Sequence, residues 1–446
     1  MGNNKCKESS EISEQTMLSQ EERQCLRRFF KSVCGDHSAC HKEDLNQHWQ
    51  DRMENGLLAL VEDYFFKNNP KSPVPFDTFI SLFIKLAKDP CGEKVKFIVS
   101  LLKQNSSDGV LTFSILMEYV KNIISSYVII LTVTDHAVLK SWRTLGVEMS
   151  DWKVILMTKS LCQDLEEENI EENIEIWFGL CSQFQKIQTA LLFHLYHIPQ
   201  EHVSYGDEVA EYCLFPMCKG VPPQHKQVFS SVLEIPDVLF LNSLLPSAMQ
   251  QQWRFCFSTG IHGESFAKML GLLVDKGPTV IIVKDKEKNV FGGYASESWT
   301  VGPNFRGDEK SFLFSLYPEM RVCHSTGYNS HYQYLNIQQQ TLPNGLGLGG
   351  QFEYFGIWLD AEFGKGHCSE TCTTYRNYKM LSATKYFEID LVEVWAVGPE
   401  FERKDTEDVR TSVRESDLEA KALLQMAGKT LHSEGMDDNL NEAEDM

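Results

Sequence analysis

The chain has 446 residues, a formal net charge of −20 at pH 7 and 42% hydrophobic residues. This length and apolar content are enough for two or three domains with cores of their own. The acidic balance argues against a nucleic-acid-binding protein, which needs a basic surface to face phosphate. Thirteen cysteines and a polar opening segment predict reduced thiols in the cytosol rather than a disulfide framework.

The chain begins with MGNNKC, in which Gly2 could accept a myristoyl group once the initiator methionine is removed. The motif prefers Ser or Thr at the sixth position, where this chain has Cys6. Because one acyl chain anchors a protein only marginally, a second signal is needed, and palmitoylation of Cys6 beside Lys5 and Lys7 would supply it. We therefore expect an acylated segment over residues 1–18, with an ordinary unanchored terminus as the alternative.

Residues 19–130 have apolar side chains at helical spacing and resemble EF-hand helix pairs. Two loops, 33–44 and 104–115, have the length of a calcium-binding loop. Such a loop needs an Asp at its first position and a bidentate Glu at its twelfth. The first positions are Val33 and Gln104, and neither loop ends in Glu. We predict a degenerate EF-hand-like helical domain without a tight calcium site.

A helical linking domain without assigned chemistry is expected over residues 131–230. The longest apolar run, residues 123–133, is shorter than the roughly 20 residues that cross a bilayer, so it predicts a buried helix. Farther along, Trp142 and Trp152 are predicted to anchor the core. Residues 175–196 repeat apolar side chains at a spacing that fits one helix.

From residue 231 the pattern becomes strand-like. Residues 279–283 and 290–299 predict a hairpin. The last run, residues 387–397, is apolar on both faces, which predicts a position inside a layered structure. Glu393 interrupts this run, and because a buried carboxylate is costly unless paired, we expect it to bind a backbone amide or a cation. Further strands are predicted over residues 312–316, 321–324, 332–335 and 354–359, with helices over 235–250 and 264–274.

The glycine-rich run at residues 344–350 contains the G-x-G-x-x-G pattern of dinucleotide sites. That pattern works between a strand and a helix N-terminus, where the helix meets pyrophosphate. Here Pro343 precedes the run and a strand-like segment follows it. We therefore predict a loop whose glycines, Gly345, Gly347 and Gly350, allow tight turns.

A polar cluster includes every group that a hydrolase needs: Ser258, His262, Glu264 and Ser265. It lacks the strained G-x-S-x-G turn, so we expect its short side chains to cap helices. Structural zinc usually shows two close ligand pairs, and only Cys213/Cys218 and Cys368/Cys372 come near that spacing. We predict no catalytic residue, no metal and no cofactor.

After Pro399 the chain becomes polar and charged, as disordered tails do, over residues 400–446. Within it, Ser416 and Glu419 form a capping box that predicts a helix over residues 416–433. The apolar stripe of this helix has no core of its own, so it either folds back onto the preceding domain or docks in a partner's groove. In a partner's groove, the contacts are predicted at Leu418, Ala420, Leu423, Leu424, Ala427 and Leu431.

Seven segments together resemble the TLDc-domain family over residues 233–398. They are WRFCFSTGIHGESF (253–266), VFGGYASESW (290–299), FLFSLYP (312–318), TGYNSHYQYLN (326–336), LPNGLGLGGQ (342–351), FGIWLD (355–360) and EVWAVG (393–398). The resemblance implies an antiparallel β-sandwich with flanking helices over residues 231–399. The whole chain is thus expected to be an α+β multidomain protein, with a C-terminal amphipathic helix.

The resemblance also implies a non-enzymatic regulator at the cytoplasmic face of the lysosomal membrane and in the cytosol. TLDc proteins are similar to ligands of the vacuolar proton pump (V-ATPase), and the most similar members are linked to mTOR signalling. Expected partners are therefore V-ATPase subunits, mTOR pathway components and the lysosomal membrane through the N-terminal lipid, with no nucleic acid. Two alternatives are an mTOR-pathway scaffold that does not bind the pump, and a redox-protective protein with a reactive thiol.

Overall fold

The computed structural model describes residues 17–35, 37–67, 71–106, 108–200, 202–205, 208–222 and 229–400. The chain divides into two compact units. The helical unit comprises Met1–Lys219 and Leu233–Gln252, and the sandwich unit comprises Gly220–Val232 and Trp253–Met446. The predicted lipidation sites and the predicted helix over residues 416–433 lie outside the described residues.

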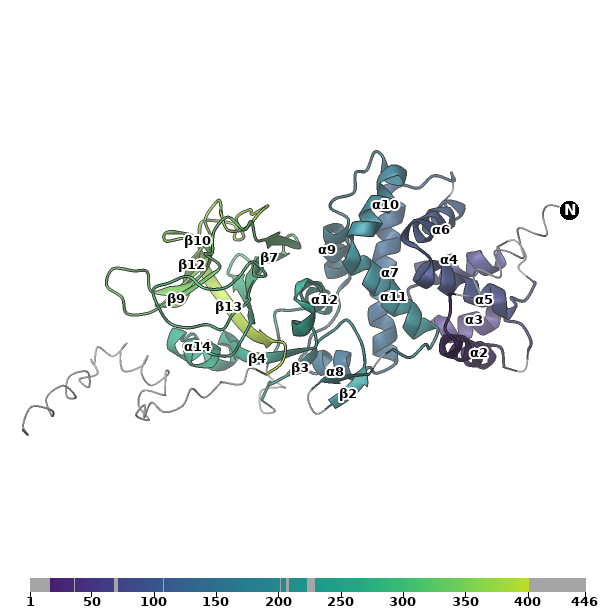
Figure 1. The fold of residues 1–446 in the computed structure, drawn as a ribbon, viewed down its shortest axis with the longest axis horizontal. Helices are drawn as coiled ribbons and strands as arrows, with labels where there is room; N and C mark the ends of the chain where they lie inside the picture. Colours follow the sequence, from purple (N-terminus) through teal and green to yellow (C-terminus); the bar gives the residue numbers. More distant parts are fainter. Residues whose placement is uncertain are drawn as a thin grey trace, which may run out of the picture. The chain divides into compact units, whose positions relative to one another are not determined.

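The helical unit begins with two helix–loop–helix pairs (Figure 1). Their helices are α2 (Gln20–Cys34), α3 (Lys42–Trp49), α4 (Asn55–Phe66) and α5 (Phe76–Phe83). An antiparallel bridge joins the two loops, since the amide of Cys40 donates to the carbonyl of Val74 at 2.8 Å and that of Val74 donates back at 2.7 Å. The loop at residues 33–44 therefore pairs with the loop between α4 and α5, which the sequence pattern did not single out.

One carboxylate in each candidate calcium loop, Asp44 or Asp108, is engaged by neighbouring residues. Asp44 accepts a hydrogen bond from the amide of His41 at 3.0 Å and so caps α3. In the second loop, Asp108 accepts from the Ser106 hydroxyl at 2.5 Å and from the Val110 amide at 3.2 Å. These are capping and turn hydrogen bonds of the kind that short acidic side chains make. Among the described residues, no group of three or more His, Cys, Asp or Glu could hold a metal ion.

The remaining helices enclose one core with the first four. Trp49 in α3 donates its indole N–H to the carbonyl of Leu195 at 3.3 Å, and the Tyr196 hydroxyl donates to the carbonyl of Phe79 at 3.1 Å. The EF-hand-like helices and the linking helices thus share buried side chains. The further elements are α6 (Cys91–Gln104), α7 (Phe113–Val133), α8 (Ala137–Arg143), α9 (Asp151–Leu161), α10 (Ile170–Leu180), α11 (Ser182–Leu195) and α12 (Ile235–Leu244), with short strands β1 (His202–Tyr205), β2 (Glu208–Glu211) and β3 (Met217–Lys219).

Helix α7 is longer than the apolar run that the sequence analysis considered. It has 21 residues, and among the described helices it is the one long and apolar enough to cross a membrane by length and composition. However, 67% of its most apolar stretch is buried inside the protein. Figure 1 shows α7 and α11 side by side in the helical unit. This burial supports the prediction of a core helix. The length of the apolar run does not support it by itself, because the whole helix is long enough to cross a bilayer.

Two details predicted for the helical unit are wrong. Trp142 is fully buried as expected, but Trp152 is 44% exposed and its ring lies 5.0 Å from the Lys153 ammonium. The single helix predicted over residues 175–196 is two helices, α10 and α11, which meet at Cys181 with a non-helical backbone (φ −80°, ψ 67°). The apolar spacing runs on because both helices face the same core, so the pattern does not reveal the break.

The sandwich unit is built from antiparallel strands in two layers. Its strands are β4 (Gln252–Ser258), β5 (Thr279–Asp285), β6 (Val290–Ala295), β7 (Phe312–Tyr317), β8 (Arg321–His324), β9 (Gln333–Asn336), β10 (Gly345–Gln351), β11 (Tyr354–Asp360), β12 (Lys365–His367) and β13 (Tyr386–Val397). The order is β8-β7-β6-β5-β13-β12-β11-β10-β9, and β4 also pairs with β13. Two short helices follow β4, α13 (Thr259–His262) and α14 (Phe266–Leu273). The predicted α+β class with an antiparallel sandwich is confirmed.

Strand β13 belongs to both layers. Its first residues pair with β12, where Glu388 lies opposite Lys365, and its later residues pair with β5, where Val392 lies opposite Val283. Between them the register shifts after Ile389. A shift of this kind bends a strand, and it lets one strand pass from one sheet to the other.

The main core fills the space between the layers. Gly293 in β6 shows how closely they approach, because a Cβ atom there would lie 2.8 Å from the side chain of Leu348 in β10. The buried residues of the core include Val283, Phe291 and Leu313 from one layer and Leu335, Leu346, Leu348, Ile357 and Leu359 from the other. This apolar layer is what holds the two sheets face to face.

The glycine-rich run is a strand, so the prediction of a loop is wrong. Residues of β10 pair with β9 on one side and with β11 on the other. The positive φ angles that the prediction required do occur, at Gly349 (71°) and Gly350 (83°). Gly347 has a different role, because a Cβ atom there would lie 2.5 Å from the ring of Phe355. Since the run lies between two strands, it also has no helix N-terminus for a dinucleotide.

Candidate binding site in the sandwich unit

A second aromatic cluster lies outside the main core, against β10 and β11. It consists of Tyr334, Phe355 and Trp358, with Phe305 packed against it. The rings of Phe355 and Trp358 stack with centroids 4.5 Å apart. Gly347 makes this possible, since any larger side chain there would collide with the Phe355 ring. The glycines of β10 therefore leave room for an aromatic wall on the sheet.

Beside this wall is a cleft of about 730 Å³. Helix α14 contributes Phe266 and Leu270 to its lining, and most residues of the connection from β9 to β10 line it as well. Clefts of this size with aromatic walls and a few polar groups are typical of binding sites. Three carboxylates also lie on the lining, those of Glu353, Asp360 and Glu362.

His367 is part of the lining of the cleft and contains a polar atom without a partner. Its Nε2 is buried and has no hydrogen-bond partner in the part of the chain that the structure describes. Burial lowers the pKa of His367, and Lys385 lowers it further, while Asp360 opposes them. The ring is therefore neutral near pH 7, and a buried nitrogen without a partner costs free energy that a bound hydrogen-bonding group would recover.

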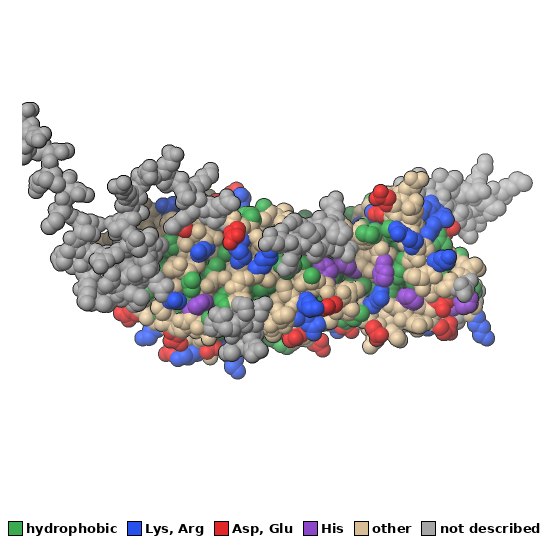
Figure 2. Space-filling view, turned by 90° about the horizontal axis from the view of Figure 1, so that it is seen from below, with side chains coloured by type: hydrophobic (Ala, Val, Ile, Leu, Met, Phe, Trp, Pro, Cys, Tyr) green, Lys and Arg blue, Asp and Glu red, His purple; other side chains and the backbone are tan. Residues whose placement is uncertain are grey.

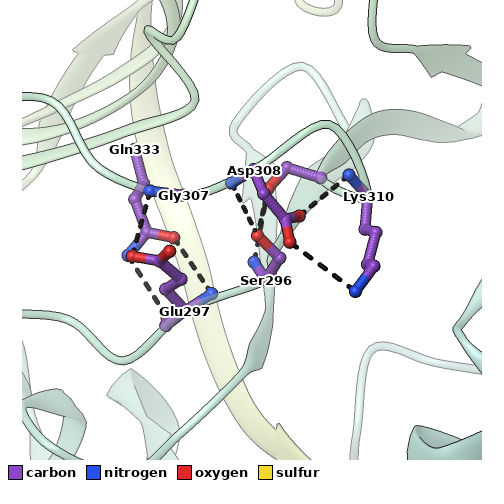
Figure 3. Close-up of polar contacts among 7 residues, drawn as sticks. Ser296, Glu297, Gly307, Asp308, Lys310 and Gln333 are labelled. Atoms are coloured by element: carbon purple, nitrogen blue, oxygen red, sulfur yellow. Dashed lines mark hydrogen bonds and ion pairs between the residues drawn. The ribbon is translucent and has the colours of Figure 1, made fainter.

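A surface loop between β6 and β7 is held by a network of hydrogen bonds (Figure 3). The buried side chain of Gln333 accepts from the amide of Glu297 at 3.4 Å and donates to its carbonyl at 3.2 Å. The Glu297 carboxylate accepts from the amide of Gly307 at 3.3 Å, and Ser296 accepts from the amide of Asp308 at 3.0 Å. The loop is thus anchored at both ends, so its exposed residues are presented in one conformation.

The cluster with the groups of a hydrolase is used for capping, as predicted. Ser258 accepts a hydrogen bond from the amide of Gly260 at 3.2 Å, and Ser265 accepts from the amide of Lys268 at 3.2 Å. His262 Nδ1 accepts from the backbone amide of Ser258 at 3.2 Å. The atom that a general base would use toward the Ser258 hydroxyl is therefore occupied by a backbone N–H.

Burial raises the pKa of the cysteines for which a shift is resolved. The pKa of Cys368 rises to about 12. A reactive thiol needs the opposite shift, because only the thiolate is a nucleophile. The cysteines with a raised pKa are Cys34, Cys40, Cys162, Cys181, Cys256, Cys323, Cys368 and Cys372.

Glu393 binds a backbone amide, as its position in an apolar strand predicted. One carboxylate oxygen accepts from the amide of Val232 at 2.7 Å. The other accepts from the hydroxyl of Ser231 at 2.7 Å and from the indole N–H of Trp395 at 3.1 Å. Burial nevertheless raises the pKa of Glu393 to about 7. The carboxylate ties the segment before α12 to the centre of the sandwich.

The site residues predicted from the sequence lie outside the described residues and stay predictions: Gly2, Cys6, Leu418, Ala420, Leu423, Leu424, Ala427 and Leu431. Sequence reasoning did not single out the cleft or His367. One local signal was available, because alternate glycines in one strand beside aromatic residues in the next predict rings lying on the sheet. On the face drawn in Figure 2, acidic and basic side chains are interspersed over the described residues, a pattern unlike a phosphate-binding surface.

Comparison with known proteins extends along almost the whole chain. A model of the TLDc domain matches residues 226–398. The chain is 35% identical to MTOR-associated protein MEAK7 of Xenopus laevis over 443 residues, which are 93% of this chain and 94% of that protein. It is 35% identical to the protein of the same name from Gallus gallus, over 91% of this chain and 87% of the relative. It is also 31% identical to nuclear receptor coactivator 7 of Homo sapiens over 169 residues, 37% of this chain and 17% of that protein.

Proposed function

The chain belongs to the family of TLDc-domain proteins that includes the mTOR-associated proteins named above, and from this we propose that it is a non-enzymatic regulator in mTOR signalling. The observation that carries the proposal is similarity over 93% of the chain to a protein named for its association with mTOR. That span covers the helical unit as well as the sandwich. A shared TLDc domain alone would be a weaker argument, because one fold serves many functions.

A role in binding rather than catalysis is supported by how the reactive side chains are used. The serines near residue 260 cap helices, and the nitrogen of His262 that could act as a base accepts from the backbone. The thiols with resolved shifts have raised pKa values, as at Cys323 and Cys368. Groups engaged in this way stabilise a scaffold and do not assemble a nucleophile with its base.

The specific partner that we propose is the V-ATPase, bound through the sandwich unit and the predicted C-terminal helix. The loop between β6 and β7 is suited to such a contact, because its hydrogen bonds to Gln333 hold it in place before binding. Preorganised surfaces lose less conformational entropy on association. The helix predicted over residues 416–433 would supply a second contact, with its apolar stripe in a groove of the pump.

We further propose that the protein works at the cytoplasmic face of the lysosomal membrane and in the cytosol. Its attachment would depend on acyl groups at Gly2 and Cys6. Two acyl groups give stable membrane attachment, whereas one gives only reversible binding. In this arrangement the N-terminal segment holds the protein at the membrane while the sandwich unit and the tail bind the pump.

The decisive experiment is a pull-down of the purified protein with intact V-ATPase. The full-length chain is compared with a chain that ends at Pro399 and with a full-length Leu423→Asp/Leu424→Asp variant, which changes only the predicted stripe. Binding that both changes weaken supports a contact through the tail. Equal binding by all three assigns the contact to the folded units and removes the tail from the proposal. No binding by any of them contradicts the pump and favours an mTOR-pathway scaffold.

A further inference from the structure

We propose that, in the free protein, the cleft beside the Phe355–Trp358 wall holds the chain's own C-terminal segment, residues 416–431. The contact would be intramolecular. It would hide the apolar stripe of residues 416–431, which we proposed above as a contact with the V-ATPase. Only the expected competition between the cleft and the V-ATPase for this stripe rests on the proposed function.

The cleft has the features of an incomplete core. Phe355, Trp358 and Leu270 line it but are themselves buried, and its partly exposed apolar surface comes from Ile337, Leu342 and Pro343. His367 Nε2 faces no hydrogen-bonding partner in the described chain. Apolar surface of this kind gains stability when it is covered. An occupant must therefore bring an apolar face together with polar groups at its edges.

The segment at residues 416–431 has both. A helix over it aligns Ala420, Leu424, Ala427 and Leu431 on one face, with Leu423 beside them. Lys421 lies three positions before Leu424, so it emerges at the edge of the same face. A helix with its stripe in a hydrophobic groove is a recurring mode of peptide recognition.

Charge complementarity favours this occupant. The cleft lining carries Glu353, Asp360 and Glu362, and no Lys or Arg side chain is part of it among the described residues. The segment carries Asp417 and Glu419 in its first turn and the cations Lys421 and Lys429 farther along, so its later part is the part that complements the lining. Ion pairs near the surface contribute little free energy. They would set the direction of the helix in the cleft rather than the strength of its binding.

The tail is long enough to reach the cleft from the end of β13. Fifteen residues lie between Glu400 and Ser416, and an extended chain of that length spans about 50 Å. A compact domain of the size matched by the TLDc model has a radius of gyration of about 16 Å. A tether of this kind gives an effective concentration of about a millimolar, so even a weak contact would be occupied within one molecule.

Competition follows from the two uses of one stripe. While residues 416–431 lie in the cleft, their apolar face is not available to a partner. A partner that binds the segment more tightly shifts the equilibrium toward the released tail. Substitutions in the cleft wall should then release the tail without changing its sequence.

The test is hydrogen–deuterium exchange on the full-length protein, read by peptide. Three proteins are compared: the unchanged chain, Leu342→Asp in the cleft and Leu424→Asp in the stripe. Each of the two variants has a matched control. Val301→Asp introduces the same change at a residue of the sandwich unit that is 38% exposed and lies outside the cleft lining. Gln425→Asp introduces an aspartate beside Leu424 in the tail, at a position off the stripe that is not a predicted contact.

The expected result has two parts. Amides of residues 420–431 exchange about tenfold more slowly in the unchanged chain than in either Leu342→Asp or Leu424→Asp, since docked helices are protected. Amides of residues 337–344 exchange faster in Leu424→Asp, although that variant leaves the cleft intact. Both control variants should exchange like the unchanged chain. Because Leu424→Asp lies in the tail, misfolding of the sandwich cannot account for its effect.

Three results would overturn the proposal. Fast exchange of residues 420–431 in every protein would mean that the tail does not dock. Protection that Leu342→Asp leaves intact would place the tail elsewhere. Protection that grows with protein concentration would mean that a second copy supplies the segment. Each is independent of the V-ATPase pull-down, so a failure of docking and a failure of pump binding can be distinguished.

Discussion

Lys153 donates a hydrogen bond from Nζ to Oδ1 of Asp237 at 2.7 Å, and the exposed fractions of the two side chains are 3% and 0%. The pair joins α9 to α12 inside the helical unit. Lys153 lies before the residues that match the TLDc model, whereas Asp237 lies among them. The first helix of the family match therefore packs with the helical unit, through a buried ion pair.

Breaking this pair should destabilise the protein strongly. Asp237→Ala removes the carboxylate to which the buried Lys153 ammonium donates, and we expect a loss of about 3–5 kcal/mol in the free energy of unfolding. Urea unfolding measures it. The double variant Lys153→Met/Asp237→Leu should recover most of the loss, because apolar replacements of a buried pair are often neutral. Glu148→Ala is the control, because it removes the exposed ion pair between Glu148 and Arg143. An equal loss of stability in Asp237→Ala and Glu148→Ala would contradict the prediction.

The stability of the sandwich unit should depend on pH through Glu393. Burial raises its pKa from an ordinary value near 4.5 to about 7. For a raised pKa, the stabilising contribution is complete below the unfolded value and is lost as pH rises through the folded one. We expect this carboxyl to cost about 3 kcal/mol of stability between pH 4.5 and pH 8.

Glu393→Gln should flatten that dependence, because the amide does not titrate. Urea unfolding of both proteins across this pH range measures the difference, so that other titrating groups cancel. Glu309→Gln, at an exposed position of the same unit, is the matched control. Parallel curves for the unchanged chain and Glu393→Gln would mean that the carboxyl is not shifted.

Replacing Gly347 should disturb the aromatic wall. A Cβ atom at this position would lie 2.5 Å from the ring of Phe355, so Gly347→Ala must displace the ring. We expect a loss of about 1–3 kcal/mol, the usual cost of overpacking. Gly302→Ala is the control, since a Cβ atom there meets no atom within 4 Å. Thermal unfolding compares the two, and equal midpoints would show that the wall tolerates the methyl group.

The buried thiols should be slow to alkylate. Burial raises the pKa values of Cys162, Cys323 and Cys368, so little thiolate is present at pH 7.5. Iodoacetamide should modify these residues at least about a hundredfold more slowly in the folded protein than in urea. Mass spectrometry of the digested protein follows each site. Rapid labelling of a single one in the folded state would revive the redox-protective alternative.

Membrane attachment should depend on Gly2. Gly2→Ala removes the acceptor amine for myristate, so we expect the protein to move from the membrane fraction to the soluble fraction. Cys6→Ser keeps the myristoyl site and should weaken attachment less. Fractionation of cells that produce each variant measures the shift. Retention of Gly2→Ala on membranes would remove myristoylation from the proposal.

Much of the sandwich could be predicted from the sequence because its signals are local. The hairpin of β5 and β6 follows from β-branched runs on both sides of a charged turn, and Glu393 was expected to bind an amide because it interrupts an apolar strand. Strand β4, Gln252–Ser258, was not predicted as a strand. The glycine-rich β10 was predicted as a loop, because isolated glycines lack the side chains on which strand propensity depends.

The sequence by itself determined the order of the elements, the TLDc family and the side chains that cap helices, since each depends on neighbours a few residues away. Only the tertiary structure decided that α12 packs with the helical unit, that β13 passes between two sheets and that Gly347 makes room for an aromatic wall. The cleft containing His367 is likewise a product of packing. These features join residues far apart in the chain, and such pairings are selected by the burial of the whole core rather than by local propensity.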